Sequence, residues 1–264
     1  MNILEEIAKR TRERVEAQKS VLSLDELRKK VCSELGSTEQ DFIFEKALRS
    51  NEMTFICEIK RASPSKGLIA PDFPYINIAK DYEAAGAAAI SVLTEPYYFK
   101  GDDRYLREIA DTVSIPLLRK DFTVDEYMIY EAKLLGASAV LLICAILNKE
   151  TIVNYLEIAH SLGLSVLVEA HTEDEVEMAL AANARVIGIN NRNLKTFDVD
   201  ITLSNRLRKM VPQEIKFVSE SGIRTAEDVN DLRKNGVDAV LVGETLMRSP
   251  DKKVALAELR GKAQ

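Results

Sequence analysis

The 264-residue sequence is poor in the residues that build metal sites and disulfide frameworks. It has three widely separated cysteines, Cys32, Cys57 and Cys144, and two histidines, His160 and His171. Zinc and iron sites need several such ligands close together, so we expect no metal centre. Cys57 and Cys144 lie inside apolar runs, and we expect them to be small buried side chains in a protein of a reducing compartment.

Long apolar runs and an excess of basic residues are absent as well. No apolar run approaches the roughly 20 residues of a membrane span. The charged, helix-patterned segment 1–19 also lacks the apolar block of a signal peptide. The net charge of −6 leaves no basic stripe that could neutralise nucleic-acid phosphates. We therefore expect a cytoplasmic protein that binds neither membranes nor nucleic acid.

From about residue 50 the chain repeats one unit, in which an apolar run, a polar turn and a helix-patterned stretch follow one another. Near-continuous apolar runs are typical of parallel strands that are covered on both faces. Capping boxes at Thr123–Glu126 and Thr172–Glu175, and a similar start at Thr225–Asp228, predict helices between the strands. The predicted strands are 55–59, 88–93, 115–118, 139–146, 164–168, 185–189, 215–219 and 238–243.

Eight such units favour a closed (β/α)8 barrel over an open doubly wound sheet. Polar residues end strand after strand, and only a closed ring brings so many strand ends to one centre. Residues 1–50 do not alternate and are helix-patterned, which predicts a helical N-terminal extension that docks on the barrel. We expect a single domain, 1–264, with the barrel in 51–264.

The first predicted strand carries an acid and a base where core residues would be expected. With a period of two, Glu58 and Lys60 share a face with Ile56, and Cys57 points the other way. Glu58 and Lys60 then point into the barrel mouth. Taken alone, a structural ion pair that fills the top of the barrel explains them equally well.

Polar residues follow the other strands in the same manner. Each buried charge has a large desolvation cost unless it has a partner, so such a set is hard to explain as structural filling alone. Titratable groups in one site also shift one another's pKa values, as acid–base catalysis requires. The set consists of Lys120, Glu169, Asn190, Arg192, Glu220 and Ser221.

Glycines after the last two strands indicate a phosphate site. Ser221-Gly222 and Gly243-Glu244 occupy these loops. In barrel enzymes this is the usual place for a phosphate held by backbone N–H groups, and glycine lets the anion approach closely. Either pair alone could be an ordinary turn, but both together, with Arg192 nearby, favour a phosphate.

Several loop residues allow two interpretations. Lys66, in the loop after the first strand, is either a mobile cation over the mouth or part of a solvated loop. Phe99, Phe122 and Leu194 suggest a wall for a flat aromatic group, or else packing beneath loops. His171 precedes the Thr172 cap, so we interpret it as a turn residue and not as a general base. We place His160 on a helix surface.

The stretch 55–65, FICEIKRASPS, resembles the signature of the indole-3-glycerol phosphate synthases, which close the indole ring in tryptophan biosynthesis. The resemblance continues in order through LLRKDF, VEAH, IGINNRNL, SESGI and LVGE and covers the whole chain, including the helical extension. The first-strand signature is specific, whereas the late glycine loops are shared by many phosphosugar barrels. The resemblance implies a cofactor-independent carboxy-lyase that acts on 1-(2-carboxyphenylamino)-1-deoxyribulose 5-phosphate and releases carbon dioxide and water. We expect a monomer.

The resemblance also implies roles for the charged residues. Lys120 would be the general acid for ring closure, and Lys60 would pair with the substrate carboxylate and could share proton delivery in the dehydration step. Glu169 would assist loss of the hydroxyl and of the ring proton. Glu58 would orient the lysines and hold a substrate hydroxyl. Which lysine acts in which step stays open.

The other implied site residues are polar groups and substrate contacts. Asn190 would bind the reacting centre, and Glu220 with Ser221 would complete the polar ring. The implied phosphate contacts are Arg192, Gly222, Gly243 and the backbone amide of Glu244, with Ser63 near the mouth. The implied anthranilate pocket consists of Pro64, Phe99, Phe122, Leu141 and Leu194.

Two features depart from the family pattern. Glu244 stands where many members have Ser or Thr, and without tryptophan the N-terminal helix lacks one candidate stacking residue.

Three other functions remain possible on this sequence. One is an aldolase in which Lys120 or Lys60 forms a Schiff base. Another is the isomerase of the preceding pathway step, which would use a Cys–Asp pair, although Cys57 points to the wrong face. The third is a non-enzymatic phosphate-binding scaffold.

Overall fold

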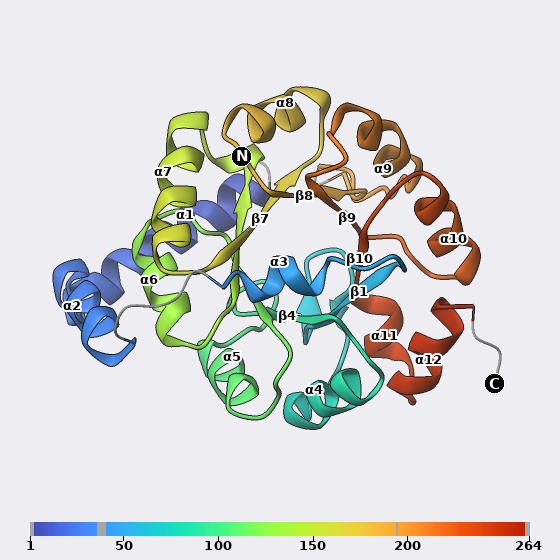
Figure 1. Ribbon diagram of the computed structural model, residues 1–264. Coiled ribbons are helices and arrows are strands. Elements are labelled where there is room, and N and C mark those ends of the chain that lie inside the picture. The colour runs from blue at the N-terminus through green and yellow to red at the C-terminus, as the bar shows by residue number, and fades with distance from the viewer. Residues whose placement is uncertain (1–2, 36–40, 194, 262–264) are drawn as a thin grey trace.

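The computed structural model describes residues 3–35, 41–193 and 195–261. Eight parallel strands close into a barrel in the order β1-β10-β9-β8-β7-β6-β5-β4, and helices surround it (Figure 1). The predicted (β/α)8 barrel is therefore confirmed. The barrel strands are β1 (Thr54–Ile59), β4 (Ala89–Leu93), β5 (Leu117–Lys120), β6 (Ala139–Ile143), β7 (Ser165–Ala170), β8 (Val186–Asn190), β9 (Lys216–Glu220) and β10 (Ala239–Val242). Two short strands, β2 (Ala62–Ser63) and β3 (Gly67–Leu68), form an antiparallel hairpin after β1.

Every predicted apolar run contains a strand, but the bounds are shifted, and two of the shifts have a clear physical cause. β5 begins at Leu117 and not at residue 115, because Pro116 has no N–H to donate to a neighbouring strand. It continues to Lys120, which pairs with Leu93 of β4. The run 139–146 is extended only to Ile143, and Cys144–Ile146 forms the 3₁₀ turn η1. Strand pairing thus reaches into the polar residues that the apolar pattern excludes.

The two faces of the strands bury different cores. Ile56, Leu118 and Leu167 belong to a cluster inside the barrel, whereas Cys57 packs beneath the surrounding helices. This is the predicted arrangement, and it places Glu58 on the inner face. Cys57 and Cys144 are buried free thiols, as expected, and Cys32 is exposed.

The helices that cover the barrel begin mostly where the caps predict. Thr225 and Asp228 form a complete capping box at α10, and the Thr172 side chain accepts a hydrogen bond at the start of α8. The box predicted at Thr123 was wrong, since α6 begins at Tyr127 and Thr123 is buried in the preceding loop. The covering helices are α4 (Tyr75–Ala84), α5 (Asp103–Ala110), α6 (Tyr127–Leu134), α7 (Lys149–Ser161), α8 (Glu173–Ala181), α9 (Thr202–Leu207), α10 (Ala226–Lys234), α11 (Glu244–Arg248) and α12 (Lys252–Leu259), with the 3₁₀ turn η2 (Arg208–Met210).

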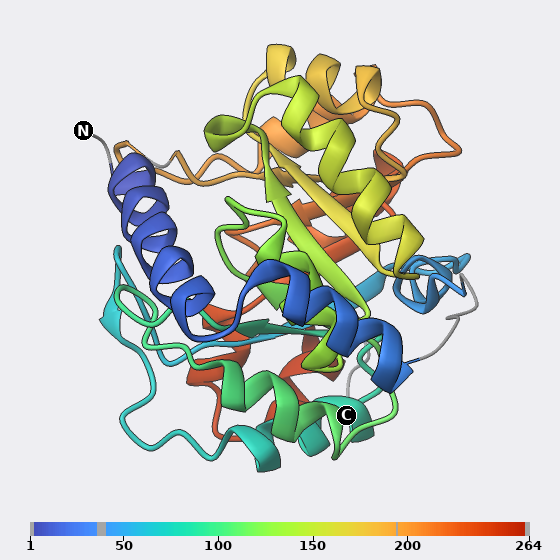
Figure 2. The ribbon, with the colours of Figure 1, turned by 90° about the vertical axis from the view of Figure 1, so that its left-hand side faces the viewer.

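The N-terminal extension forms α1 (Ile3–Val21), α2 (Leu24–Leu35) and α3 (Ile43–Ala47) and docks on the barrel as expected. Figure 2 shows α1 and the α3 segment at opposite ends of the barrel. At the α3 end, Phe44 and Leu48 join the inner core, and the backbone N–H of Glu45 donates to Ser165 Oγ (3.3 Å), at the first residue of β7. The extension therefore closes the N-terminal end of the barrel.

The helix α1 is tied to the opposite end by charged groups. Arg14 donates to Asp121 (2.8 Å), which directly follows Lys120 of the barrel. Arg119 points outward, away from Lys120 as predicted, and is buried between Asp103 (2.7 Å) and Glu131 (2.6 Å). This network fixes α1 over the C-terminal ends of the strands.

Two further expectations concern the surface. His160, which we placed on a helix surface, is half-buried against the ring of Phe42 (5.5 Å between ring centroids). Burial, together with nearby Arg185, lowers the pKa of His160 to about 4. Within the described residues, no helix is both long and apolar enough to cross a membrane.

Candidate active site

The C-terminal ends of the strands surround a cavity of about 420 Å³. Every predicted site residue lines this cavity except Leu194, which lies outside the described residues. The sequence thus identified the wall of the cavity, although the chemical roles of these residues stay predictions.

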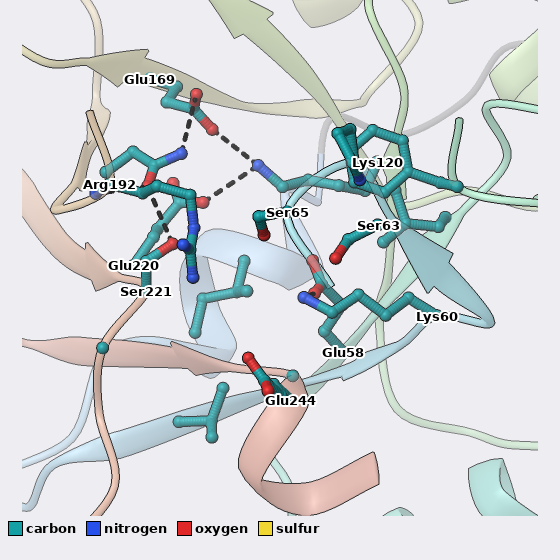
Figure 3. A pocket seen from close by; sticks show the side chains of 18 of the residues that line it. Glu58, Lys60, Ser63, Ser65, Lys120, Glu169, Arg192, Glu220, Ser221 and Glu244 are labelled. Atoms are coloured by element: carbon teal, nitrogen blue, oxygen red, sulfur yellow. Dashed lines mark hydrogen bonds and ion pairs between the residues drawn. The ribbon is translucent and has the colours of Figure 1, made fainter. Parts of the chain in front are cut away.

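Lys120 is held by two carboxylates from other strands. Its Nζ lies 2.7 Å from Glu169 Oε2 of β7 and 3.0 Å from Glu220 Oε2 of β9 (Figure 3). The Lys120 side chain is 13% exposed, and each glutamate side chain is 3% exposed. Water screens these charges little, so each of the three groups strongly influences the protonation of the others.

The two glutamates respond to this environment in opposite directions. Burial favours the neutral acid in both. At Glu169 the charges of Lys120 and His171 outweigh burial and lower the pKa of the carboxyl group. At Glu220 burial prevails, with repulsion from Glu169 and Glu58, and the pKa rises to about 7. The glutamates also raise the pKa of Lys120 despite its own burial, so that lysine is an ammonium at neutral pH.

Glu58 and Lys60 form a second ion pair, in which Lys60 Nζ lies 2.6 Å from Glu58 Oε1. Figure 3 shows Lys60 and Lys120 reaching the cavity from different sides. A Cβ atom at Gly243 would clash with Glu58 Oε1 and lie 2.9 Å from Lys60 Nζ, so a side chain here would have to displace the ends of this pair. The ion pair that the sequence left open as structural filling is therefore part of the cavity wall.

Asn190 connects the glutamates to the loops that follow β8 and β9. Its Nδ2 donates to Glu169 Oε1 (3.3 Å), and its Oδ1 accepts from Ser221 Oγ (2.8 Å) and from the backbone N–H of Arg192 (3.1 Å). The Arg192 side chain donates to the carbonyl of Phe197 (3.0 Å) and lies at the cavity. These bonds fix the amide, with its nitrogen toward the carboxylate.

The predicted phosphate loops meet at the cavity rim. Ser221 and Gly222 both have positive φ angles (66° and 87°), which sharply turns the chain after β9. Lys66, which we left open as a mobile cation or a solvated loop residue, lies 3.8 Å from Glu244. Arg248 holds the same carboxylate at 3.0 Å. The Glu244 side chain is thus engaged by two basic groups, which leaves its backbone as the candidate phosphate contact.

An apolar wall faces the charged groups. Phe99 and Phe122, whose ring centroids are 6.2 Å apart, form part of it, as predicted. Sequence reasoning missed the contribution of α1, which adds Ile3, Leu4 and Ile7. Their helical spacing predicted only a helix that docks on the barrel, and no local signal shows that this face of the helix lies at the mouth.

His171 was interpreted as a turn residue, and it does lie in the turn between β7 and α8. However, its Nε2 also lies 3.4 Å from Glu169 Oε1, and its Nδ1 lies 3.2 Å from Glu175 Oε2. Its position two residues after Glu169 was the available sequence signal. Among the described residues, no group of three or more His, Cys, Asp and Glu side chains could hold a metal ion.

The chain matches known proteins over nearly its whole length. The sequence matches the family model "Indole-3-glycerol phosphate synthase" over residues 4–259. An indole-3-glycerol phosphate synthase of Ruminiclostridium cellulolyticum is 59% identical over 99% of this chain and 100% of its own. That of Endomicrobium trichonymphae is 51% identical over 98% of this chain and 99% of its own.

Solved structures with much lower identity share the fold. A 3-hexulose-6-phosphate synthase has a TM-score of 0.62 at 14% identity and covers 80% of this chain and all of its own. KGPDC from Streptococcus mutans has a TM-score of 0.62 at 10% identity, over 80% of this chain and 97% of its own. These likenesses concern the barrel alone. The full-length matches to curated relatives show that this chain belongs to the indole-3-glycerol phosphate synthase family.

Proposed function

We propose that this protein closes the indole ring of 1-(2-carboxyphenylamino)-1-deoxyribulose 5-phosphate, with loss of carbon dioxide and water, in tryptophan biosynthesis. The observation that carries this proposal is the position of Lys120, a buried ammonium held between two carboxylates at the mouth of a family-typical barrel. An apolar wall with two phenylalanines lies at the same cavity. Charged groups and an aromatic wall suit a substrate that is both a sugar phosphate and an anthranilate.

In the first step, Lys120 acts as the general acid. The substrate carbon that bears the carboxylate attacks the ribulose carbonyl, and the carbonyl oxygen takes a proton from the Lys120 ammonium. Loss of carbon dioxide then returns the electrons to the aromatic ring. Glu169 and Glu220 hold the ammonium in place and keep it protonated until the oxygen becomes basic.

In the second step, the new hydroxyl leaves as water and the adjacent carbon of the new ring loses a proton. Glu169 accepts this proton, because its lowered pKa makes it a carboxylate at neutral pH. Lys60 pairs with the substrate carboxylate until carbon dioxide is lost, and in the second step it shares proton delivery to the leaving hydroxyl. Glu58, at 2.6 Å, orients Lys60 throughout. Asn190 holds Glu169 and, with Ser221, completes the polar ring.

The substrate is oriented by its two ends. The phosphate is bound by Arg192 and by the backbone N–H groups of Gly222, Gly243 and Glu244, with Ser63 near the mouth. The anthranilate ring lies against the apolar wall, which includes Pro64, Phe99, Phe122 and Leu141. We also propose a cytoplasmic monomer that needs no cofactor and binds no nucleic acid.

The rival chemistries have less support. A Schiff base needs a neutral amine, whereas the pKa of Lys120 is raised. The isomerase reading needs a reactive cysteine at the mouth, but burial beneath the helices raises the pKa of Cys57 to about 12. A scaffold protein would have no need for the buried, mutually paired charges of the cavity.

The test is the conversion of the carboxyphenylamino substrate, followed by the appearance of indole fluorescence. Wild-type protein should give this signal, and Lys120→Ala should lower turnover at least about 100-fold while substrate binding survives. Lys234→Ala, which changes an exposed lysine of α10, is the matched control and should retain wild-type turnover. Near-normal turnover of Lys120→Ala would refute the role of Lys120. A borohydride-trapped adduct on the wild type would favour the aldolase.

A further inference from the structure

We propose that His171 is a positioning residue for Glu169, held by Glu175 so that its imidazolium lies against the Glu169 oxygen that Lys120 does not bind. This inference rests on the proposed role of Glu169 as the base of the second step. The three residues form a line from the start of α8 to the cavity, in which Glu175 holds His171 and His171 faces Glu169.

The first link is made by Glu175. Thr172 caps α8 by accepting from the Glu175 N–H (3.2 Å), which fixes the first turn of that helix. The Glu175 carboxylate turns back and accepts from the backbone N–H of His171 (2.7 Å), and the same oxygen lies 3.2 Å from His171 Nδ1. In an ordinary capping box the carboxylate would return to the cap residue itself. Here the carboxylate accepts from the backbone N–H of the residue before the cap, and it orients the imidazole of that residue.

The second link is made by Nε2. This atom is buried, and it makes no hydrogen bond of normal geometry with any described residue. Its nearest charged neighbour is Glu169 Oε1, at 3.4 Å. The same oxygen accepts from Asn190 (3.3 Å), while Lys120 binds the other oxygen. Both oxygens of Glu169 are therefore held, and His171 supplies the second cation.

The groups around His171 favour its charged form. Glu169 of β7, Glu220 of β9 and Glu175 of α8 are the acids that act on it. Burial alone would lower the pKa of His171, but these carboxylates outweigh it and raise that pKa. Cys144 of η1, whose Sγ donates to the Glu175 carbonyl (3.6 Å), is neutral, because burial raises the pKa of its thiol to about 12.

The reaction explains why a second cation is useful. When Lys120 gives its proton to the substrate, it becomes a neutral amine and no longer stabilises the charge on Glu169. An imidazolium at 3.4 Å keeps Glu169 ionised at that moment, so Glu169 stays ready to accept the ring proton. The proton can then pass from Glu169 to the Lys120 amine at 2.7 Å, which restores the ammonium.

Histidine NMR tests the geometry without any assay of activity. The chain has two histidines, and the pKa of His160 is near 4, so the two ring titrations are well separated. In the wild type His171 should titrate above its ordinary value of 6.5. In Glu175→Gln, whose amide can still accept from the His171 N–H, the pKa should fall by about one unit while that of His160 does not move. A wild-type His171 that titrates at or below 6.5, or that ignores Glu175→Gln, would overturn the inference.

Kinetics then separate positioning from structural support. His171→Gln should lower kcat between about tenfold and 100-fold with KM changed less than about twofold. The acid limb of its kcat profile should move up by about one pH unit, because Glu169 loses a neighbouring positive charge. His160→Gln, remote from the cavity, is the control and should match the wild type. If the wild type is active and the His171→Gln profile coincides with it, this inference fails. If the wild type makes no indole product, the proposed function fails, and the NMR titrations still decide the geometry.

Discussion

The pKa of Glu220 leads to a quantitative prediction about stability. Burial raises this pKa from 4.5 to about 7, so the folded protein keeps a proton on Glu220 that the unfolded chain releases at lower pH. Below pH 4.5 both states carry the proton, and above pH 7 neither does. Between these values only the folded state binds it, and stability falls as the pH rises. Glu220→Gln cannot ionise and should not show this loss.

The magnitude follows from the two pKa values. One pKa unit corresponds to about 1.4 kcal/mol, and between pH 5 and pH 8 the ionisation of Glu220 should cost the wild type about 2.5 kcal/mol. The free energy of unfolding of Glu220→Gln, relative to the wild type, should therefore increase by about this amount over the same range.

Urea unfolding at pH 5 and pH 8 measures this difference for both proteins. Glu214→Gln, which changes an exposed glutamate, is the control and should show no pH-dependent difference from the wild type. If Glu220→Gln and the wild type differ equally at both pH values, Glu220 does not hold a proton near neutrality. The reasoning from its burial would then be refuted. The same variant should lose activity, since it weakens the hold on Lys120, which fits the usual conflict between stability and an active site.

Three further predictions concern the cavity and its support. Gly243→Ala should lower kcat/KM by about 100-fold, because its methyl group would displace the Glu58–Lys60 pair. An unchanged kcat/KM would show that this pair can move without loss of catalysis. Phe122→Leu should raise KM about threefold to tenfold at nearly constant kcat, since it removes an aromatic contact but keeps the apolar wall; a fall in kcat alone would contradict the assigned role. Arg119→Met should lower the free energy of unfolding by about 3 kcal/mol, measured in urea, because Asp103 and Glu131 would lose the buried guanidinium between them. A variant as stable as the wild type would show that this network does not support α1 and the barrel.

Most residues that line the cavity could be predicted from the sequence, because short-range rules determine which face of a strand carries each side chain. The period of two along β1 put Glu58 and Lys60 on the inner face, and the structure has them there. The same rules failed where tertiary pairing sets the outcome. β5 extends through Lys120 because that residue pairs with Leu93, and Thr123 does not start a helix. The apolar pattern of the sequence shows neither the pairing of Lys120 with Leu93 nor the absence of a helix start at Thr123.

In the N-terminal extension, too, local pattern predicted one feature and tertiary contacts decided another. Helical spacing predicted the buried face of α1, and Leu4 and Ile7 are buried. That this face lies against the cavity follows from ties such as Arg14 to Asp121, whose partners are 107 positions apart. No local pattern encodes such a tie.

The sequence by itself determined the alternation of strands and helices, the inner face of the first strand and the set of polar residues at the strand ends. Each of these depends on residues within a few positions of one another, where backbone geometry sets which side chains share a face. Tertiary structure decided which charges became partners. Lys120 meets Glu169 and Glu220, which are 49 and 100 positions away, only because the strands close into a ring. The contact of His171 with Glu169 is local by contrast, because the turn into α8 and the partly buried Glu175 carboxylate orient its ring toward that glutamate.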